Sequence, residues 1–249
     1  MYRIVAVEFL NTLPFIEALR NSAYLTKNCI VTTADPKTCA ISLFNNTADI
    51  ALLPVSAIHD FDHLYRLTDY GIASNGEVKT VGIFSNKKWE DIHTICKSSV
   101  SRSSNNLLDI INRHFWKLEK KIIEHTDNII ADAQLIIGDE AFNGHKIFQY
   151  YYDLSQIWKE KTKLPFVFAT WMSRTIIDSN FILELNRAFQ NSTSPSELHK
   201  IASKFGDRSA EIESYFKNNI CYLINPEMIK SMHYFFELNE WKWNIADEF

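Results

Sequence analysis

The chain opens with a strand, a polar bend and a helix in direct succession, and this order constrains the fold most strongly. An apolar, β-favouring run covers residues 3–9, and apolar residues at helical spacing follow from Leu13 to Leu19. Asn11 lies between them, where open α/β sheets bind ligands, because unpaired N–H groups at a helix start attract anions. Asn11 is therefore either a ligand-binding residue or a helix cap, with Pro14 tolerated in the first turn.

The second half of the chain repeats this order. A strand within residues 92–100 is followed by a polar bend at 101–106 and a helical pattern from Leu107 to Trp116. Each half then has a segment that begins Ala-Asp and becomes an apolar strand, at residues 48–54 and 131–139. The pattern predicts two similar α/β lobes, with the two leading bends facing each other across a cleft.

The remaining segments suggest where the chain passes between the lobes. Residues 64–84 are typical of two strands joined by a turn at Asn75-Gly76, and the β-favouring run at 164–171 should return the chain to the first lobe. We expect the first lobe to comprise residues 1–85 and 172–249 and the second 86–171, with hinges near 83–88 and 168–172. After Asp178 the pattern predicts only helices, at 178–190, 195–204, 208–218 and 226–238.

Charge and cysteine usage exclude several classes of function. The 249 residues carry a formal net charge of −4 with no long basic run, so we expect neither nucleic acid nor a membrane surface as a partner. The four cysteines form no C-x-x-C pair, so no metal site is expected. No signal peptide precedes the first strand and no apolar run has membrane-spanning length, so we expect a cytoplasmic protein.

Five motifs in order resemble those of one enzyme family. They lie at residues 9–14, 71–80, 101–104, 137–141 and 153–171, and the similarity extends from residue 3 to about 174. The sequence resembles the chorismate dehydratases, the first enzymes of the futalosine route to menaquinone. The resemblance implies a periplasmic-binding-protein-like, type II α/β fold with two lobes, a hinge and a central cleft.

The same resemblance implies a reaction. Chorismate loses a ring hydroxyl and the proton of the neighbouring carbon, which gives 3-[(1-carboxyvinyl)oxy]benzoate and water. Because the ring becomes aromatic, the driving force is intrinsic to the substrate, and no cofactor or metal is implied. Chorismate is then the expected small-molecule partner, and the sequence does not indicate an oligomeric state.

Two catalytic positions follow from the resemblance. The Asn of the first bend corresponds to Asn11, and the hydroxyl residue after the Asn-Gly turn corresponds to Thr80. The chain departs from the family pattern at two places: the family commonly has serine where this chain has Thr80, which keeps the hydroxyl and adds a methyl, and Asp-Gly-Pro where this chain has Asn75-Gly76-Glu77. Without the resemblance, Thr80 would be an ordinary β-branched strand residue.

Substrate-binding residues are expected around both bends. The hydroxyls and helix start at residues 101–104 suit a carboxylate, although Ser103 or Ser104 could simply be the helix cap. Arg102 could form a bidentate pair with a carboxylate or lie on the surface. Asp139 should be hydrogen-bonded and structural, since an unpaired carboxylate beside an anionic substrate is costly. The full expected binding set is Thr12, Ser74, Ser101, Arg102, Ser103, Ser104, Asn105, Asp139 and Trp171.

These motifs supply amides, hydroxyls and helix ends but no strong base. We therefore expect elimination assisted by the substrate, in which the enolpyruvyl carboxylate of chorismate removes the ring proton. Two alternatives stay open: an enzyme like 1,4-dihydroxy-6-naphthoate synthase, whose Ser-Pro-Cys-Pro-Asn type bend is absent here, and a solute-binding protein for an anionic small molecule. Trp171 is either a wall of the cleft or, as is commoner for large aromatic residues, part of the core.

Overall fold

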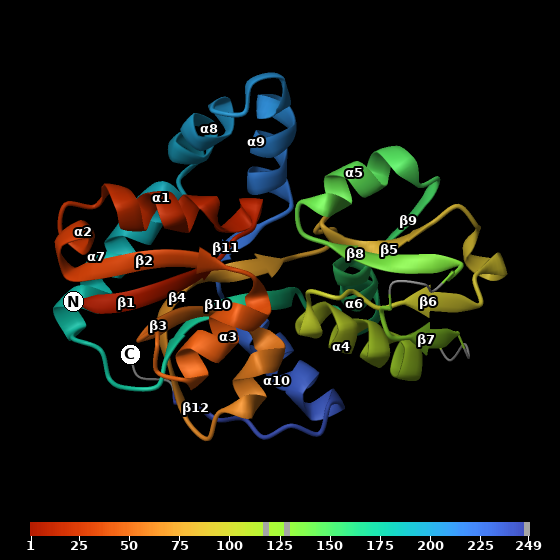
Figure 1. Cartoon of the computed structure of the whole chain (residues 1–249), viewed down its shortest axis with the longest axis horizontal. Coiled ribbons are helices and arrows are strands. Elements are labelled where there is room, and N and C mark those ends of the chain that lie inside the picture. The colour runs from red at the N-terminus through yellow and green to blue at the C-terminus, as the bar shows by residue number, and fades with distance from the viewer. Residues whose placement is uncertain (117–119, 127–129, 247–249) are drawn as a thin grey trace.

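The computed structural model describes residues 1–116, 120–126 and 130–246, and it contains two α/β lobes side by side (Figure 1). The first lobe holds a sheet made of β1 (Tyr2–Val7), β2 (Cys29–Ala34), β3 (Ile50–Pro54), β4 (Leu64–Ser74), β10 (Phe166–Ser173), β11 (Cys221–Leu223) and β12 (Ile245–Ala246). The second lobe holds a smaller sheet made of β5 (Val81–Ser85), β6 (Thr94–Cys96), β7 (Lys121–Ile123), β8 (Ala133–Ile137) and β9 (Tyr150–Asp153).

Helices cover both faces of the first sheet. On one side lie α1 (Leu13–Asn21) and α7 (Ser179–Ser192), and on the other α3 (Pro36–Phe44) and α10 (Pro226–Leu238) (Figure 1). The other helices associated with this lobe are η1 (Leu10–Thr12), α2 (Leu25–Asn28), η2 (Val55–Asp60), α8 (Pro195–Ser203), η5 (Gly206–Arg208) and α9 (Ser209–Asn218). A parallel sheet with both faces covered needs apolar strands, and every residue of β3 is buried.

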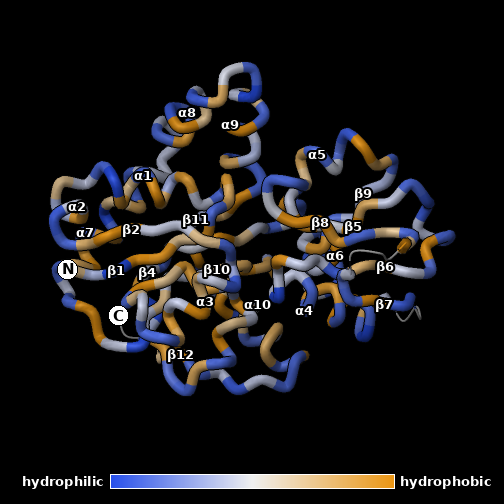
Figure 2. Tube along the Cα trace, viewed as in Figure 1, coloured by the Kyte–Doolittle hydropathy of each residue, from blue (hydrophilic) through white to orange (hydrophobic). Residues whose placement is uncertain are grey.

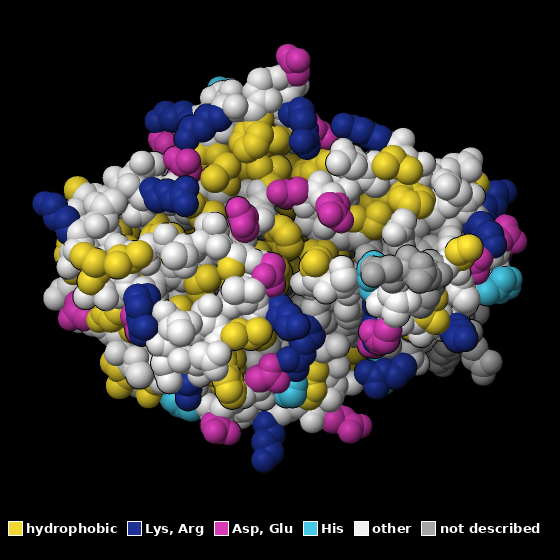
Figure 3. Space-filling model, viewed as in Figure 1, with side chains coloured by type: hydrophobic (Ala, Val, Ile, Leu, Met, Phe, Trp, Pro, Cys, Tyr) yellow, Lys and Arg dark blue, Asp and Glu magenta, His cyan; other side chains and the backbone are white. Residues whose placement is uncertain are grey.

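The second sheet is covered in the same manner by fewer helices. These are η3 (Trp89–Asp91), α4 (Arg102–Ile110), η4 (Ile111–Trp116), α5 (Glu140–Ile147) and α6 (Leu154–Thr162). The strands at the centre of both lobes are largely hydrophobic, whereas loops and outer helix surfaces are hydrophilic (Figure 2). On the face shown in Figure 3, cationic and anionic side chains are interspersed rather than gathered into one field of a single sign.

The two sheets have the same topology. The first has the order β2-β1-β3-β10-β4 with β11 beyond β4, and the second has β7-β6-β8-β5-β9. In each, the first three strands are parallel and the fourth is antiparallel to its neighbours. The antiparallel strand is the one that enters from the other lobe. The expected repetition of strand, bend and helix is therefore confirmed, with β1 and η1 in one lobe matching β6 and the start of α4 in the other.

The crossings between the sheets differ from the expected hinges. β5 pairs with β8 and β9 in the second sheet, and β10 pairs with β3 and β4 in the first. The chain therefore crosses at residues 75–80 and again after β9, through α6. The turn at Asn75-Gly76 does not close a hairpin; Gly76 and Lys79, with φ of 127° and 65°, redirect the chain into the other lobe.

The C-terminal region agrees with the expected helices but is not wholly helical. α7, α8, α9 and α10 begin and end close to the predicted positions. Between α9 and α10, however, Cys221–Leu223 forms the edge strand β11 beside β4, and Ile245–Ala246 adds the short β12. Such three-residue and two-residue strands arise from an available sheet edge, and no alternation in so short a segment could have predicted them.

Candidate active site

A partly open cavity lies between the two lobes. The empty space within it, including open solvent at its mouth, is about 550 Å³. It is bordered by the carboxyl ends of β1, β3 and β8, by Val78, Thr80 and Val81, and by the start of α4. The carboxyl ends of parallel strands meet the opposing helix start here, which is where the sequence placed the cleft.

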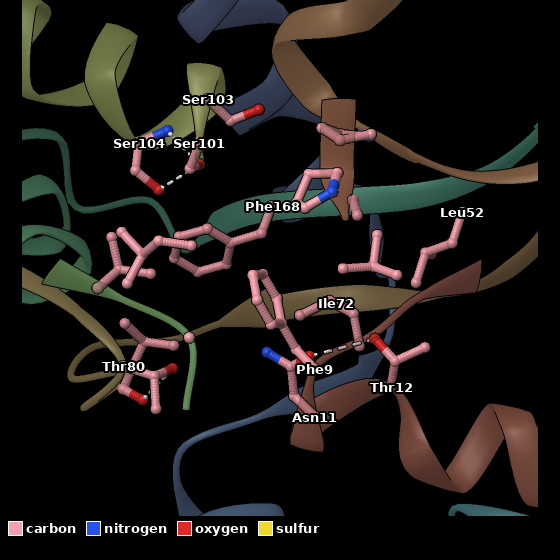
Figure 4. Close-up of a pocket in the computed structure, with 18 residues that line it drawn as sticks. Phe9, Asn11, Thr12, Leu52, Ile72, Thr80, Ser101, Ser103, Ser104 and Phe168 are labelled. Carbon is pink, nitrogen blue, oxygen red and sulfur yellow. Dashed lines mark hydrogen bonds between the residues drawn. The ribbon is translucent and has the colours of Figure 1, made fainter. Parts of the chain in front are cut away.

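Asn11 and Thr12 form the floor of this cavity in the first lobe (Figure 4). Asn11 lies in η1, and its Oδ1 accepts a hydrogen bond of 3.2 Å from Thr12 Oγ1. Helix α1 begins after Thr12 with no side-chain cap. The alternative that Asn11 serves only as a helix cap is therefore wrong, and its amide nitrogen remains available for the cavity.

Thr80 comes from the crossing segment just before β5 and also borders the cavity. The carboxylate of Asp153 fixes this segment, since it accepts hydrogen bonds from the amides of Val78 at 2.9 Å and Lys79 at 2.8 Å. The Tyr151 hydroxyl donates to the same carboxylate at 2.5 Å. Burial raises the pKa of Asp153, and these hydrogen bonds oppose the rise. The buried carboxylate of Asp153, with its hydrogen bonds to the amides of Val78 and Lys79, thus fixes the backbone that leads into Thr80.

The start of α4 faces Asn11 from the second lobe (Figure 4). Ser101, and not Ser103 or Ser104, is the N-cap: its Oγ accepts from the Ser104 amide at 3.2 Å and donates to Ser104 Oγ at 2.9 Å. Ser103 Oγ accepts from the amide of Ser56 at 3.1 Å. The hydroxyl protons of Ser103 and Ser104 therefore remain to be donated, in line with the positive end of the helix dipole.

Arg102 and Asn105 lie on the same helix turn but do not border the cavity. Arg102 forms an ion pair with Asp60 of the first lobe and contacts His59 Nε2 at 2.5 Å. The Asn105 side chain binds the backbone of Ser98, with bonds of 2.9 and 2.8 Å. Of the two roles considered for Arg102, the structure supports the surface position. Asn105 stabilises the loop that precedes α4.

We expect Arg102→Ala to leave the KM for a substrate in this cavity within about threefold of the wild-type value, because the guanidinium already pairs with Asp60 and exposed ion pairs contribute little. Steady-state kinetics of the variant would measure this. A rise in KM of more than about tenfold would instead assign Arg102 to the substrate carboxylate.

Three other expected binding residues lie outside the cavity lining. Ser74 Oγ donates to the carbonyl of Gly76 at 2.9 Å, and Asp139 Oδ1 accepts from the Leu10 amide at 3.0 Å. Asp139 is hydrogen-bonded as expected, and this bond joins the two lobes; burial raises its pKa, while the bond from Leu10 opposes the rise. Trp171 is fully buried against Phe15 and Phe189, so it is a core residue and not a wall of the cleft.

The sequence interpretation missed the apolar walls of the cavity and the residue behind its polar corner. Phe9 and Phe168 direct their rings into the space, with Leu52 and Ile72 beside them (Figure 4). Tyr215 of α9 lies behind Thr80, with its hydroxyl 2.9 Å from Thr80 Oγ1. Helical spacing identifies Tyr215 as inward-facing but gives no sign of what its hydroxyl contacts.

The chemistry of the lining is therefore apolar with uncharged donors. Among the described residues that border the cavity, none carries a charged side chain. Polar groups lie at two ends, with Asn11, Thr12 and Thr80 at one and the serines of α4 at the other (Figure 4). The described parts of the chain contain no group of His, Cys, Asp or Glu side chains suited to a metal ion. Within the same residues, no helix has both the length and the apolar character to span a bilayer.

Comparison with solved structures identifies the architecture. Protein AF1704 from Archaeoglobus fulgidus superposes with a TM-score of 0.69 over 96% of both chains, at 16% sequence identity. The alkanesulfonate-binding protein SsuA from Xanthomonas axonopodis pv. citri, bound to MOPS, gives 0.63 at 10% identity over 99% of this chain and 98% of that one. The Candida albicans CA3427 gene product, described as having the generic periplasmic binding protein fold, gives 0.60 at 10% identity over 99% and 96%.

These similarities and the shared strand order confirm the two-lobe periplasmic-binding-protein-like α/β fold of type II. At such low identities they establish the fold and not the ligand. A family model described as menaquinone biosynthesis matches residues 2–240, which is nearly the whole chain. The chain therefore belongs to the menaquinone biosynthesis family.

Proposed function

We propose that this protein is a chorismate dehydratase, which converts chorismate to 3-[(1-carboxyvinyl)oxy]benzoate and water. The observation that carries the proposal is the meeting of Asn11 of the first lobe and Thr80 of the crossing segment, 69 positions apart in the sequence, at one end of a cavity with uncharged donors at the other. The family membership supports a role in menaquinone biosynthesis, and the ordered motifs point to this reaction within it.

The cavity suits the shape and charge of chorismate. The substrate has a flat, unsaturated ring, which the apolar walls formed by Phe9 and Phe168 can enclose. Chorismate has two carboxylates, and one of them must stay basic to accept the ring proton. Uncharged hydrogen-bond donors can hold such a carboxylate without lowering its basicity as a cationic side chain would. Hydroxyls and the α4 start at one end, and Asn11 and Thr80 at the other, can supply such donors.

The elimination breaks one C–O bond and the neighbouring C–H bond, and the electron pair of the C–H bond completes the aromatic ring. The proton acceptor is the enolpyruvyl carboxylate of the substrate itself, because the cavity lining has no ionisable base among its described residues. Asn11 and Thr80 position this carboxylate or the departing hydroxyl. Holding a base in the same molecule at the right geometry can lower the barrier by about 7–11 kcal/mol at best.

Thr80 offers a matched pair of variants. Thr80→Ser keeps the hydroxyl and should keep kcat within about threefold, whereas Thr80→Val keeps the shape and should lower kcat by about 10- to 100-fold through loss of one donor. Initial rates of chorismate loss would measure both. Equal rates for the serine and valine variants would remove Thr80 from the mechanism.

A calorimetric titration with chorismate, followed by chromatography of the same sample, tests the proposed function. Binding together with formation of the aromatic product supports the dehydratase. Saturable binding with chorismate recovered intact would contradict it and favour the solute-binding alternative, which the similarity to binding proteins of this fold keeps relevant. The absence of both binding and turnover would reject chorismate as the ligand.

A further inference from the structure

Behind the cavity, the side chain of Tyr215 lies beside Asn11 and Thr80, the two residues proposed to act in catalysis. Tyr215 of α9 is 2% exposed, its hydroxyl lies 2.9 Å from Thr80 Oγ1, and the Asn11 side chain is near enough to oppose the rise in its pKa. It does not border the cavity itself. The Phe142 ring of α5 packs edge-on against it, with centroids 5.2 Å apart, which holds the ring from the second lobe.

The partners of Asn11 determine the direction of these hydrogen bonds. Its Oδ1 accepts from Thr12 Oγ1, and its amide nitrogen is on the side that faces Thr80 (Figure 4). The amide nitrogen can only donate, so toward the nearby Tyr215 oxygen it can act only as a donor. The single phenol proton is then left for Thr80 Oγ1.

The proton of Thr80 is directed by the same sequence of bonds. Because Thr80 Oγ1 accepts from Tyr215, its own proton is donated to the carbonyl of Val78 at 3.5 Å, a long bond that a substrate oxygen at ordinary hydrogen-bond distance would replace. The second N–H of Asn11 is available in the same way. Both residues then present donors toward the cavity. Burial raises the pKa of Tyr215, so the phenol keeps the proton on which this order depends.

We propose that Tyr215 is a positioning residue, which orders the hydrogen-bond chain Thr12–Asn11–Tyr215–Thr80 so that Asn11 and Thr80 both donate to oxygen atoms of the substrate. The inference rests on the proposed dehydration. It assigns Thr80 as a hydrogen-bond donor to a substrate oxygen rather than as a proton acceptor. Tyr215 touches no substrate atom and acts through Thr80 and Asn11.

Tyr215→Phe removes one oxygen and retains the ring that packs on Phe142. We expect kcat for chorismate to fall by about 10- to 100-fold with KM changed less than about threefold, because the donors lose alignment while the cavity keeps its shape. Tyr222→Phe is the matched control: Tyr222 is equally buried, but its hydroxyl has no hydrogen-bond partner among the described residues. Its kcat should equal that of the wild type.

A double-mutant cycle separates positioning from a structural contribution. If Tyr215 acts through Thr80, the variant carrying both Thr80→Val and Tyr215→Phe should be no more than about twofold slower than Thr80→Val. Losses that multiply would overturn the proposal, as would a kcat for Tyr215→Phe equal to that of Tyr222→Phe. Thermal unfolding of each variant shows that the protein is folded.

A second variant covers the case in which Tyr215→Phe does not fold. Phe142→Leu loosens the ring of Tyr215 and leaves the four hydrogen-bonding residues intact, so kcat should fall without a matching rise in KM. An unchanged kcat would contradict the proposal. A wild-type protein that does not convert chorismate would reject the proposed function itself, whereas a wild-type protein that converts it as fast as Tyr215→Phe does would reject only the role of Tyr215.

Discussion

Asn11→Ala should lower kcat for chorismate dehydration by about 100- to 1,000-fold, the loss typical of removing one directed donor from an active site. Asn11 is half-buried, makes no helix cap, and lies in η1 against the cavity. Its removal therefore withdraws a hydrogen-bond donor from the cavity. Steady-state kinetics with product quantified by chromatography would measure the loss.

The fold should tolerate this change. The side chain accepts a hydrogen bond from Thr12 Oγ1 but supports no strand or helix end, so the melting temperature should fall by no more than a few degrees. Thr12→Val is a useful companion variant because Thr12 is fully buried and, within the described part of the chain, its hydroxyl donates only to Asn11 Oδ1. It should have a smaller effect on kcat. Near-normal turnover by Asn11→Ala would remove Asn11 from the mechanism.

Gly138→Ala should lower kcat/KM by about 100-fold, because the two lobes could no longer close on each other. Gly138 follows β8 with φ of +65°, and a Cβ there would lie 2.7 Å from Cε1 of Phe9 in the first lobe. Both residues border the cavity. The Gly138 amide also donates to the Thr80 carbonyl at 2.8 Å, so a displaced Gly138 would move Thr80 as well.

Gly206→Ala separates this steric effect from backbone strain. Gly206 has a similar φ of +57°, but a Cβ there would meet nothing within 4 Å. Both variants should lose about 1 kcal/mol of stability from the left-handed backbone. Only Gly138→Ala should lose activity, and the comparison needs only melting temperatures and kcat/KM. Equal activity in the two variants would show that close contact of the lobes at Phe9 is not required.

Local sequence patterns predicted the features that depend on neighbouring residues, namely the strands, the polar bends and the helices. The alternation of apolar strands, polar bends and helices identified two α/β lobes, and the bends at Asn11 and Ser101 lie across one cavity as expected. Strand pairing over long distances was not accessible in this way. Asn75-Gly76 is a sound turn signal, but only the pairing of β5 with β8 and β9 shows that the chain leaves the first lobe there.

Side-chain roles were predictable only where one segment determines them. Arg102 is adjacent to the serines of α4 in sequence, yet Asp60, 42 residues away, draws its guanidinium to the surface. Trp171 lies in a strand that crosses the first lobe, where Phe15 and Phe189 enclose it. Tyr215 is separated from Thr80 by 135 positions, so no local spacing could reveal their contact.

A proton NMR time course of the wild-type protein with chorismate tests the central claim most directly. If the cavity dehydrates chorismate, the signals of the cyclohexadiene ring should disappear as those of a meta-disubstituted aromatic ring appear in equal amount, with the enolpyruvyl vinyl protons retained. The Asn11→Ala protein in a parallel sample should convert chorismate far more slowly. Chorismate that persists at the rate seen without protein would contradict the assignment.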